Sequence, residues 1–257
     1  PVYYRLHPLE TMDANVIGLR SLLEIARDAR AREREDGVQG LVFFSSSEVY
    51  GDPIAEAIPT AETYRGNVSC TGPRACYDES KRYGETLCVN FAQQHDVPVV
   101  MVRPFNNYGP GLKISDRRVI PDFCRDVLAG RDIVMLSDGS ATRTFCYVAD
   151  AVSGYIKALV RGRPGEPYNV GVEAPEVSMA DLAERVVRLA AEIVGYEGRV
   201  LRGESDDSAY LVDNPARRCP DITKARSELG YDPRVGLDEG LRRSLIWYDA
   251  HRDATEA

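Results

Sequence analysis

A tyrosine and a lysine four residues apart are the side chains in this sequence best placed for acid–base chemistry. They are Tyr77 and Lys81, and residues 82–89 continue with the mixture of apolar and charged positions typical of a helix. On a helix, positions i and i+4 share one face, so the ammonium would lie beside the phenol. An adjacent ammonium favours the phenolate and would make Tyr77 a better proton acceptor. The same spacing occurs by chance on solvated faces, so the pair needs support from other motifs.

Polar side chains also follow two predicted buried strands, 40–45 and 98–102. Ser45, Ser46, Ser47 and Glu48 end the first strand, and 103–108 follows the second. In open α/β sheets, ligands bind outside the carboxyl ends of the strands, so these side chains are expected to converge with Tyr77. A carboxylate can act as base or acid, and hydroxyls can bind a substrate hydroxyl or carboxylate. The alternative is that the serines merely end a strand and Glu48 is solvated.

The elements that must position these residues alternate between helix and strand. In the first half they are helix 11–30, strand 40–45, the Tyr77/Lys81 helix and strand 98–102, which is the order of an α/β fold with a parallel sheet. After Gly111 the elements become shorter and are expected to cap that sheet. We predict helices at 119–128, 150–160, 179–194, 225–229 and 237–248, strands at 133–136 and 144–148 around a turn at 137–140, a strand end at 168–171 and a loop at 211–220.

Composition excludes several classes of protein. The 257 residues are 44% hydrophobic and 28% charged, as in an ordinary globular protein, and the net charge of −8 argues against a general nucleic-acid binder. The six cysteines show no C-x-x-C pairing and the three histidines lie far apart, so neither a metal site nor a disulfide framework is expected. No signal peptide is expected, and no apolar run reaches membrane-spanning length. A cytoplasmic protein without a membrane partner is therefore predicted.

Three arginines stand in predicted loops or at the starts of elements: Arg118, Arg143 and Arg218. A guanidinium suits bidentate recognition of phosphate, so even an acidic protein can bind a phosphate through a local arginine cluster. By themselves these three residues are better explained by surface salt bridges.

Five motifs in this order resemble the extended short-chain dehydrogenase/reductase superfamily, whose members act on nucleotide sugars. They are Pro-Val-Tyr-Tyr at 1–4 before a helix with Asn15 and Gly18, Ser-Ser-Ser-Glu-Val-Tyr-Gly at 45–51, Tyr-x-x-x-Lys at 77–81, Arg-Pro-Phe-Asn-Asn-Tyr-Gly-Pro at 103–110, and Thr-Arg-x-Phe-x-Tyr-Val-x-Asp at 142–150. The resemblance implies a Rossmann-like, doubly wound parallel sheet. Residues 1–111 would be the remainder of the NAD-binding domain, and 112–257 mainly a nucleotide-sugar-binding region, with about 140–160 returning to the first domain.

Within the superfamily the sequence is most similar to UDP-glucuronate decarboxylases (UDP-xylose synthases). The similar segments are 47–53, 64–68, Gly-Pro-Arg-Ala-Cys-Tyr-Asp-Glu-Ser-Lys at 72–81, 116–119 and 213–222. The 4-epimerases usually carry a small residue where Glu48 stands, and many 4,6-dehydratases carry Asp-Glu. GDP-mannose dehydratases also have Ser-Glu, so a dehydratase or epimerase is the alternative. A non-catalytic sugar- or NAD-binding relative would usually have lost the Tyr77/Lys81 pair.

The resemblance implies a cycle at C4 of the sugar, with NAD as cofactor. Tyr77, helped by Lys81, would act in C4 oxidation, carbon dioxide would leave, and C4 would be reduced again. Ser46, Ser47 and Glu48 would assist the loss of carbon dioxide, and Arg218 would protonate or steer the intermediate. The implied NAD contacts are Ser45, Tyr77, Lys81 and Phe105. The implied nucleotide-sugar contacts are Tyr4, Asn106, Arg118, Arg143, Tyr147 and Arg218. A homodimer is expected through a four-helix bundle of helix 11–30 and the Tyr77/Lys81 helix.

Two departures from the family pattern stand out. The family has arginine where this chain has Gly111. A substrate or dimer contact could therefore differ, and the product could be a sugar other than xylose. The Gly-rich phosphate loop of the family is absent from the sequence. In the family it lies ahead of the position of Pro1, and we expect roughly 60–90 further residues there, from the size of a βαβ unit. Arg74 lies inside the decarboxylase signature without an assignable role.

Overall fold

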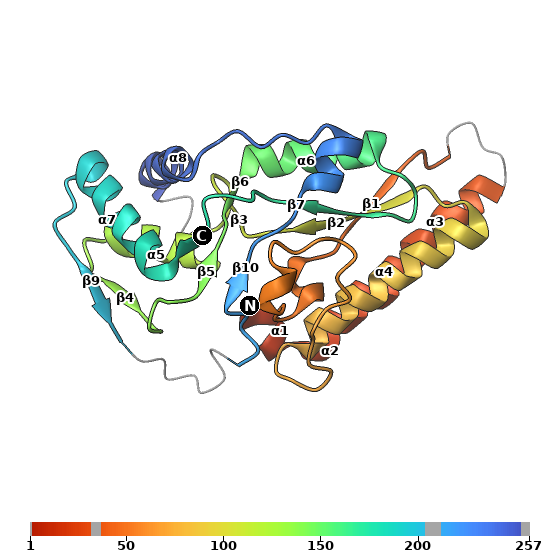
Figure 1. Cartoon of the computed structure of the whole chain (residues 1–257), viewed down its shortest axis with the longest axis horizontal. Helices are drawn as coiled ribbons and strands as arrows, with labels where there is room; N and C mark the ends of the chain where they lie inside the picture. Colours follow the sequence, from red (N-terminus) through yellow and green to blue (C-terminus); the bar gives the residue numbers. More distant parts are fainter. Residues whose placement is uncertain (1, 32–36, 204–211, 253–257) are drawn as a thin grey trace.

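The computed structural model describes residues 2–31, 37–203 and 212–252 (Figure 1). Three parallel strands form its central sheet, in the order β1 (Leu41–Phe44), β2 (Val99–Pro104) and β7 (Pro167–Val170). The first two strands lie within about two residues of their predicted positions. The α/β fold and its parallel sheet are therefore confirmed.

Helices cover both faces of this sheet, which explains why its strands are continuously apolar. Along β2, Val100 and Val102 pack with α6 (Val148–Arg161) on one face. Val99 and Met101 pack on the other face with α3 (Leu19–Ala31) and α4 (Ala75–His95). Figure 1 shows α6 on one side of the strands and the α3/α4 pair on the other. α4 thus lies against the sheet whose strand ends carry the polar motifs.

The predicted helix 11–30 is longer and less regular than expected. Helical structure already begins at α1 (Val2–Leu6) and continues through α2 (Pro8–Asp13), the π-helical segment η1 (Ala14–Gly18) and α3. His7, with φ −130°, separates α1 from α2, and Pro8 opens α2 at a position where its missing N–H costs nothing. Residues 32–36, which follow α3, lie outside the described residues.

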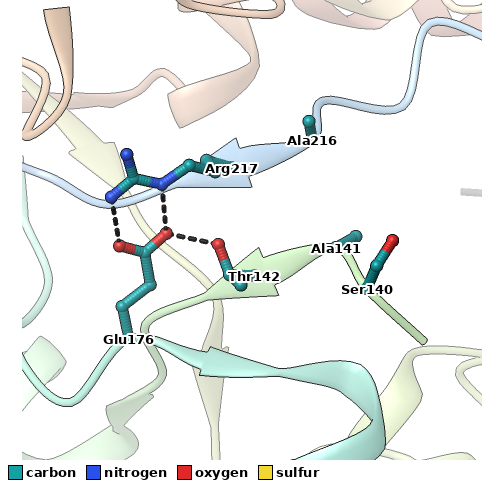
Figure 2. Close-up of a pocket in the computed structure, with 6 residues that line it drawn as sticks. All are labelled: Ser140, Ala141, Thr142, Glu176, Ala216 and Arg217. Carbon is teal, nitrogen blue, oxygen red and sulfur yellow. Dashed lines mark hydrogen bonds and ion pairs between the residues drawn. The ribbon is translucent and has the colours of Figure 1, made fainter. Parts of the chain in front are cut away.

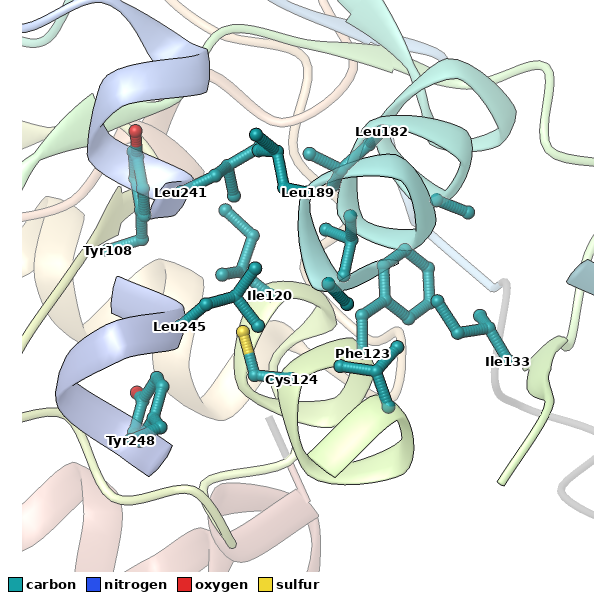
Figure 3. Close-up of a cluster of buried hydrophobic side chains, with 14 of the residues drawn as sticks. Tyr108, Ile120, Phe123, Cys124, Ile133, Leu182, Leu189, Leu241, Leu245 and Tyr248 are labelled. Carbon is teal, nitrogen blue, oxygen red and sulfur yellow. The ribbon is translucent and has the colours of Figure 1, made fainter. Parts of the chain in front are cut away.

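Three helices of the second half enclose the largest core. These are α5 (Val119–Leu128), α7 (Met179–Val194) and α8 (Leu237–Ala250), and the first two have the predicted bounds. Figure 3 shows Leu182 and Leu189 of α7 directed toward Ile120 and Phe123 of α5, with Leu245 of α8 closing the cluster. The 3–4 spacing of apolar residues therefore predicted both the helices and the faces that they bury.

The small strands of the second half pair differently from the prediction. β4 (Ile133–Met135) pairs with β9 (Val200–Arg202), and β5 (Thr142–Arg143) lies between β8 (Val177–Ser178) and β10 (Arg217–Arg218). β3 (Asn107–Tyr108) pairs with β6 (Cys146–Tyr147). The strands around 137–140 do not pair with each other, because each finds its partner elsewhere in the chain. The predicted loop 211–220 contains β10; Leu211 lies outside the described residues.

Short helical segments complete the architecture: η2 (Ser47–Tyr50), η3 (Ala55–Ala57) and η4 (Ala225–Leu229). α6 belongs to the second half of the sequence, but it contacts β1, β2 and β7 of the central sheet. Among the residues with a described structure, no helix is long and apolar enough to cross a membrane. Within the same residues, no group of three histidine, cysteine or acidic side chains could hold a metal ion.

Candidate active site

The site begins with two arginines on neighbouring short strands. Arg143 of β5 and Arg218 of β10 are direct register partners, so their side chains lie on one face of this small sheet. Their neighbours Thr142 and Arg217 lie on the other face, where Glu176 accepts hydrogen bonds from both and an open cavity is formed (Figure 2). The pairing of β5 with β10 therefore directs one arginine pair inward and leaves the other face to solvent.

The inward-facing Arg218 forms an ion pair with Glu48. The Arg218 Nη2 donates to Glu48 Oε2 at 3.0 Å, and Arg74 donates to the same oxygen. Ser46 caps the short helix η2 and accepts a hydrogen bond from the Glu48 N–H at 3.2 Å. Burial alone would raise the pKa of Glu48, but Arg218, Arg74 and Arg143 outweigh burial and hold this pKa below its ordinary value. Glu48 is therefore a carboxylate at neutral pH and can only accept hydrogen bonds.

Tyr77 and Lys81 lie beside this cluster on α4, on one face as predicted. The Tyr77 ring stacks on Tyr4, with centroids 5.1 Å apart, and the Lys81 Nζ lies 5.6 Å from the centroid of the Tyr77 ring. Lys81 was expected to lower the pKa of Tyr77, but burial has the larger effect on this pKa. Burial raises the pKa of the Tyr77 phenol, and a hydrogen bond with Ser46 only partly offsets this. Burial likewise lowers the pKa of Lys81, whose Nζ donates to the Phe44 carbonyl at 2.9 Å.

A buried ion pair anchors α4 to the end of β2. Arg103 Nε donates to Glu85 Oε1 at 2.8 Å, and its Nη1 donates to the Tyr50 hydroxyl at 2.7 Å. The Ser45 hydroxyl donates to the same Glu85 oxygen at 2.5 Å. Glu85 follows Lys81 by four residues, so one face of α4 carries the acid–base pair and its anchor. Sequence reasoning missed this role of Glu85 and Arg103, although the i+4 spacing was a usable signal.

Three of the other residues predicted to contact substrate or NAD interact with other parts of the chain. Arg143 lies near Glu48, and its guanidinium donates to the carbonyl oxygens of Thr142, Pro215 and Ala216. Asn106 follows β2 with φ +43° and donates to the Thr144 carbonyl at 2.9 Å. Phe105 is buried against Tyr50.

Two predicted sugar contacts lie outside the Glu48 cluster. Arg118 is exposed, occupies the N-cap position of α5, and pairs with Asp116 at 2.7 Å. Its charge partly opposes the rise in the pKa of Tyr77 that burial causes. Tyr147 packs edge-on against Tyr108 in the core of the second half, with ring centroids 5.9 Å apart.

Gly111, the departure from the family pattern, has a backbone reason in this chain. Its φ is +88°, a conformation that side chains disfavour, while an added Cβ would meet nothing within 4 Å. Space is therefore available here, and the left-handed backbone is what favours glycine.

Comparison with known proteins identifies the family of this chain. Residues 4–171 match the NAD dependent epimerase/dehydratase family. The chain belongs to this family. UDP-glucuronic acid decarboxylase 3 of Arabidopsis thaliana is 39% identical over 241 residues, 94% of this chain and 64% of that protein. The chain thus spans just under two thirds of this curated relative.

Solved structures agree on the fold. The UDP-glucose 4-epimerase of Thermotoga maritima, solved with UDP-glucose, has a TM-score of 0.82 at 24% identity, over 98% of this chain and 74% of that chain. The dTDP-glucose 4,6-dehydratase DesIV of Streptomyces venezuelae, solved with NAD, has a TM-score of 0.79 at 25% identity, over 98% and 70%. The predicted superfamily, the Rossmann-like fold and the likeness to UDP-glucuronate decarboxylases are confirmed.

The anchor of α4 can be tested by removing Glu85. We expect Glu85→Ala to lower the free energy of unfolding by about 3–5 kcal/mol, because it leaves the Arg103 charge buried without a carboxylate. Glu79→Ala is the matched control on the same helix. The pair of Glu79 with Arg82, at 3.6 Å, is exposed, so this change should cost less than about 1 kcal/mol. Urea unfolding followed by circular dichroism measures both. Equal losses in the two variants would contradict the anchor.

Proposed function

We propose that the full-length protein is an NAD-dependent decarboxylase of a nucleotide-activated sugar acid, converting UDP-glucuronate to UDP-xylose. The observation that carries this proposal is the ionised Glu48, held by two arginines beside Tyr77. The likeness to UDP-glucuronic acid decarboxylase 3 supports the same substrate.

The charge of the cluster favours an acidic sugar over a neutral one. Three arginines, Arg74, Arg143 and Arg218, act on Glu48. The other carboxylates around them are Asp78, on which Arg74, Arg218 and Asp213 act, and Asp52, which acts on Arg143. The donors of Arg143 go to neutral carbonyl oxygens, and burial together with Arg218 lowers its pKa to about 10. Positive charge from three arginines is therefore concentrated around Glu48, next to Tyr77. A sugar carboxylate could pair with these arginines, whereas a hexose hydroxymethyl group could not.

The proposed cycle assigns the proton movements at the 4-hydroxyl to Tyr77, which must act as the phenolate although burial raises the pKa of its phenol. Tyr77 accepts the proton of the 4-hydroxyl as the C4 hydrogen leaves as hydride. The resulting 4-ketone accepts the electron pair of the breaking C5–C6 bond, so carbon dioxide leaves and an enolate remains. Arg218 lies where its positive charge stabilises that enolate, and Glu48 stays ionised throughout. C5 takes up one proton from water, hydride then returns to C4, and Tyr77 gives its proton back to the 4-oxygen.

The residues present fit the ribose end of NAD. Lys81 uses one N–H for the Phe44 carbonyl, so its ammonium has further donors for ribose hydroxyls, and it lies beside Tyr77. NAD, when bound, supplies the hydride acceptor and donor at C4. Ser45 and Phe105 were also predicted to contact NAD; the Ser45 hydroxyl is engaged by Glu85 and Phe105 is buried, so we assign the ribose to Tyr77 and Lys81.

The reaction is tested by incubating the full-length protein and NAD with UDP-glucuronate and analysing the product by mass spectrometry. We expect a product lighter by one carbon dioxide. Tyr77→Phe should lower the rate roughly 10²- to 10⁴-fold, the usual contribution of acid–base catalysis. Tyr83→Phe is the matched control, because Tyr83 lies on the same helix with its side chain exposed.

Other outcomes would overturn this assignment. Loss of water from a neutral sugar nucleotide, without decarboxylation of UDP-glucuronate, would indicate a 4,6-dehydratase. Inversion at C4 with all carbon retained would indicate an epimerase. The absence of both turnover and enzyme-bound NADH absorbance would indicate a non-catalytic binding protein.

We further propose that the protein forms a homodimer through its N-terminal helices, in the cytoplasm. Six exposed apolar side chains of the segment from α1 to α3 support this: Tyr3, Leu6, Leu9, Ile17, Leu22 and Ile25. Exposed apolar side chains that form a patch commonly mark an interface. The six cysteines are free thiols, which suits a reducing compartment.

The dimer proposal predicts that Ile25→Glu shifts the molar mass from dimer to monomer, because it places a charge in the apolar interface. Ile246→Glu on α8 introduces the same change at a comparably exposed isoleucine, 51% against 61%, and should leave the dimer intact. Size-exclusion chromatography with light scattering measures the mass. A dimer that persists in Ile25→Glu would contradict the proposed interface.

A further inference from the structure

Arg74 connects the start of helix α4 to the Glu48 carboxylate. Its carbonyl accepts the first hydrogen bonds of the helix, from the N–H groups of Tyr77 at 3.0 Å and Asp78 at 3.1 Å. Its guanidinium donates to Glu48 Oε2 from a position only 15% exposed. The backbone that places Tyr77 and the side chain that holds Glu48 therefore belong to one residue.

Asp78 is a second carboxylate beside the same guanidinium. Its Oδ2 lies 3.7 Å from Arg74 Nε, and its side chain is 7% exposed. Asp78 Oδ1 and Arg74 Nε are both buried without a hydrogen-bond partner among the described residues. Burial, followed by the charge of Glu48, raises the pKa of Asp78 to about 7. Two carboxylates thus compete for Arg74, and Asp78, with its raised pKa, is the weaker competitor.

We propose that Arg74 is a positioning residue for Glu48, and that Asp78 sets how strongly Arg74 holds it. The inference rests on the proposed function in one respect, namely that Glu48 faces the reacting sugar. Both arginines bind Glu48 through Oε2, and Oε1 has no hydrogen bond to any described residue. The clamp thereby fixes the carboxylate and leaves one oxygen for the substrate.

The two neighbours of Glu48 act in opposite directions. Arg74 stabilises the ionised form of Glu48, so its removal should raise the pKa of Glu48. Ionised Asp78 adds negative charge and shares Arg74, so neutralising Asp78 should lower that pKa. The charged or titratable groups that act on Asp78 or are acted on by it are Glu48, Arg74, Arg218, Asp213, Tyr4, Cys76 and Tyr77.

The experiment titrates Glu48 directly in the NAD-loaded, full-length protein. Glutamate is labelled with ¹³C at the side-chain carboxyl, and the Glu48 signal is assigned by its loss in Glu48→Gln. We expect Arg74→Ala to raise the Glu48 pKa by about 1 unit or more, and Arg74→Lys to restore most of the shift. Asp78→Asn should lower the Glu48 pKa. Arg188→Ala, which removes an exposed arginine of α7, is the control and should leave it unchanged.

Turnover of UDP-glucuronate provides the second readout. Arg74→Ala should lower kcat roughly 10- to 100-fold, the rate equivalent of one charge-assisted hydrogen bond, and move the acid limb of the pH profile upward. Asp78→Asn should move that limb downward. A wild-type protein that fails to decarboxylate would overturn the proposed function, while the titration still decides on Arg74.

Two titration results would overturn the inference. One is a Glu48 pKa that is the same in wild type, Arg74→Ala and Arg74→Lys. The other is an Asp78→Asn variant in which the pKa of Glu48 stays constant or rises. Asp78→Asn is close to isosteric, so it decides the question even where Arg74→Ala does not fold.

Discussion

The ion pair between Glu48 and Arg218 is the interaction on which the rest of the structure depends. The two residues are 170 positions apart, and the Arg218 side chain is only 3% exposed. Burying both charges is costly unless their geometry and their other hydrogen bonds are well satisfied. Arg218 meets this condition because β10 pairs with β5 and because it also donates to the Ser47 carbonyl. The second half of the chain thereby completes a site whose acid–base residues lie in the first half.

Helix α4 supplies the other half of the geometry. Tyr77, Lys81 and Glu85 follow one another at i+4 spacing and thus share a face. Each interacts with a different residue at the ends of β1 and β2: Ser46, the Phe44 carbonyl and Arg103 respectively. Sliding or turning the helix would break all three contacts at once. The same contacts place the Tyr77 phenol in a buried setting, so its proton affinity is set by the fold more than by Lys81.

Local patterns in the sequence predicted much of this arrangement, and long-range pairing limited the rest. The apolar periodicity of 119–128 and 179–194 gave α5 and α7, and the buried runs gave β1 and β2. The convergence of Glu48 and Tyr77 followed from the rule for strand ends. Strands of two residues, such as β5 and β10, carry too little pattern to reveal a partner. The raised pKa of Tyr77 was also inaccessible, because it depends on burial that only the assembled fold creates.

The central claim is that the Glu48 cluster receives the acidic end of the sugar while residue 77 faces C4. A crystal structure of the full-length Tyr77→Phe variant with NAD and UDP-glucuronate tests it most directly. The account predicts the sugar carboxylate beside Glu48 Oε1 and within hydrogen-bond distance of Arg218 or Arg143, with the 4-hydroxyl at the edge of the aromatic ring at position 77. A carboxylate directed away from these arginines, with the C4 hydroxyl remote from position 77, would contradict it.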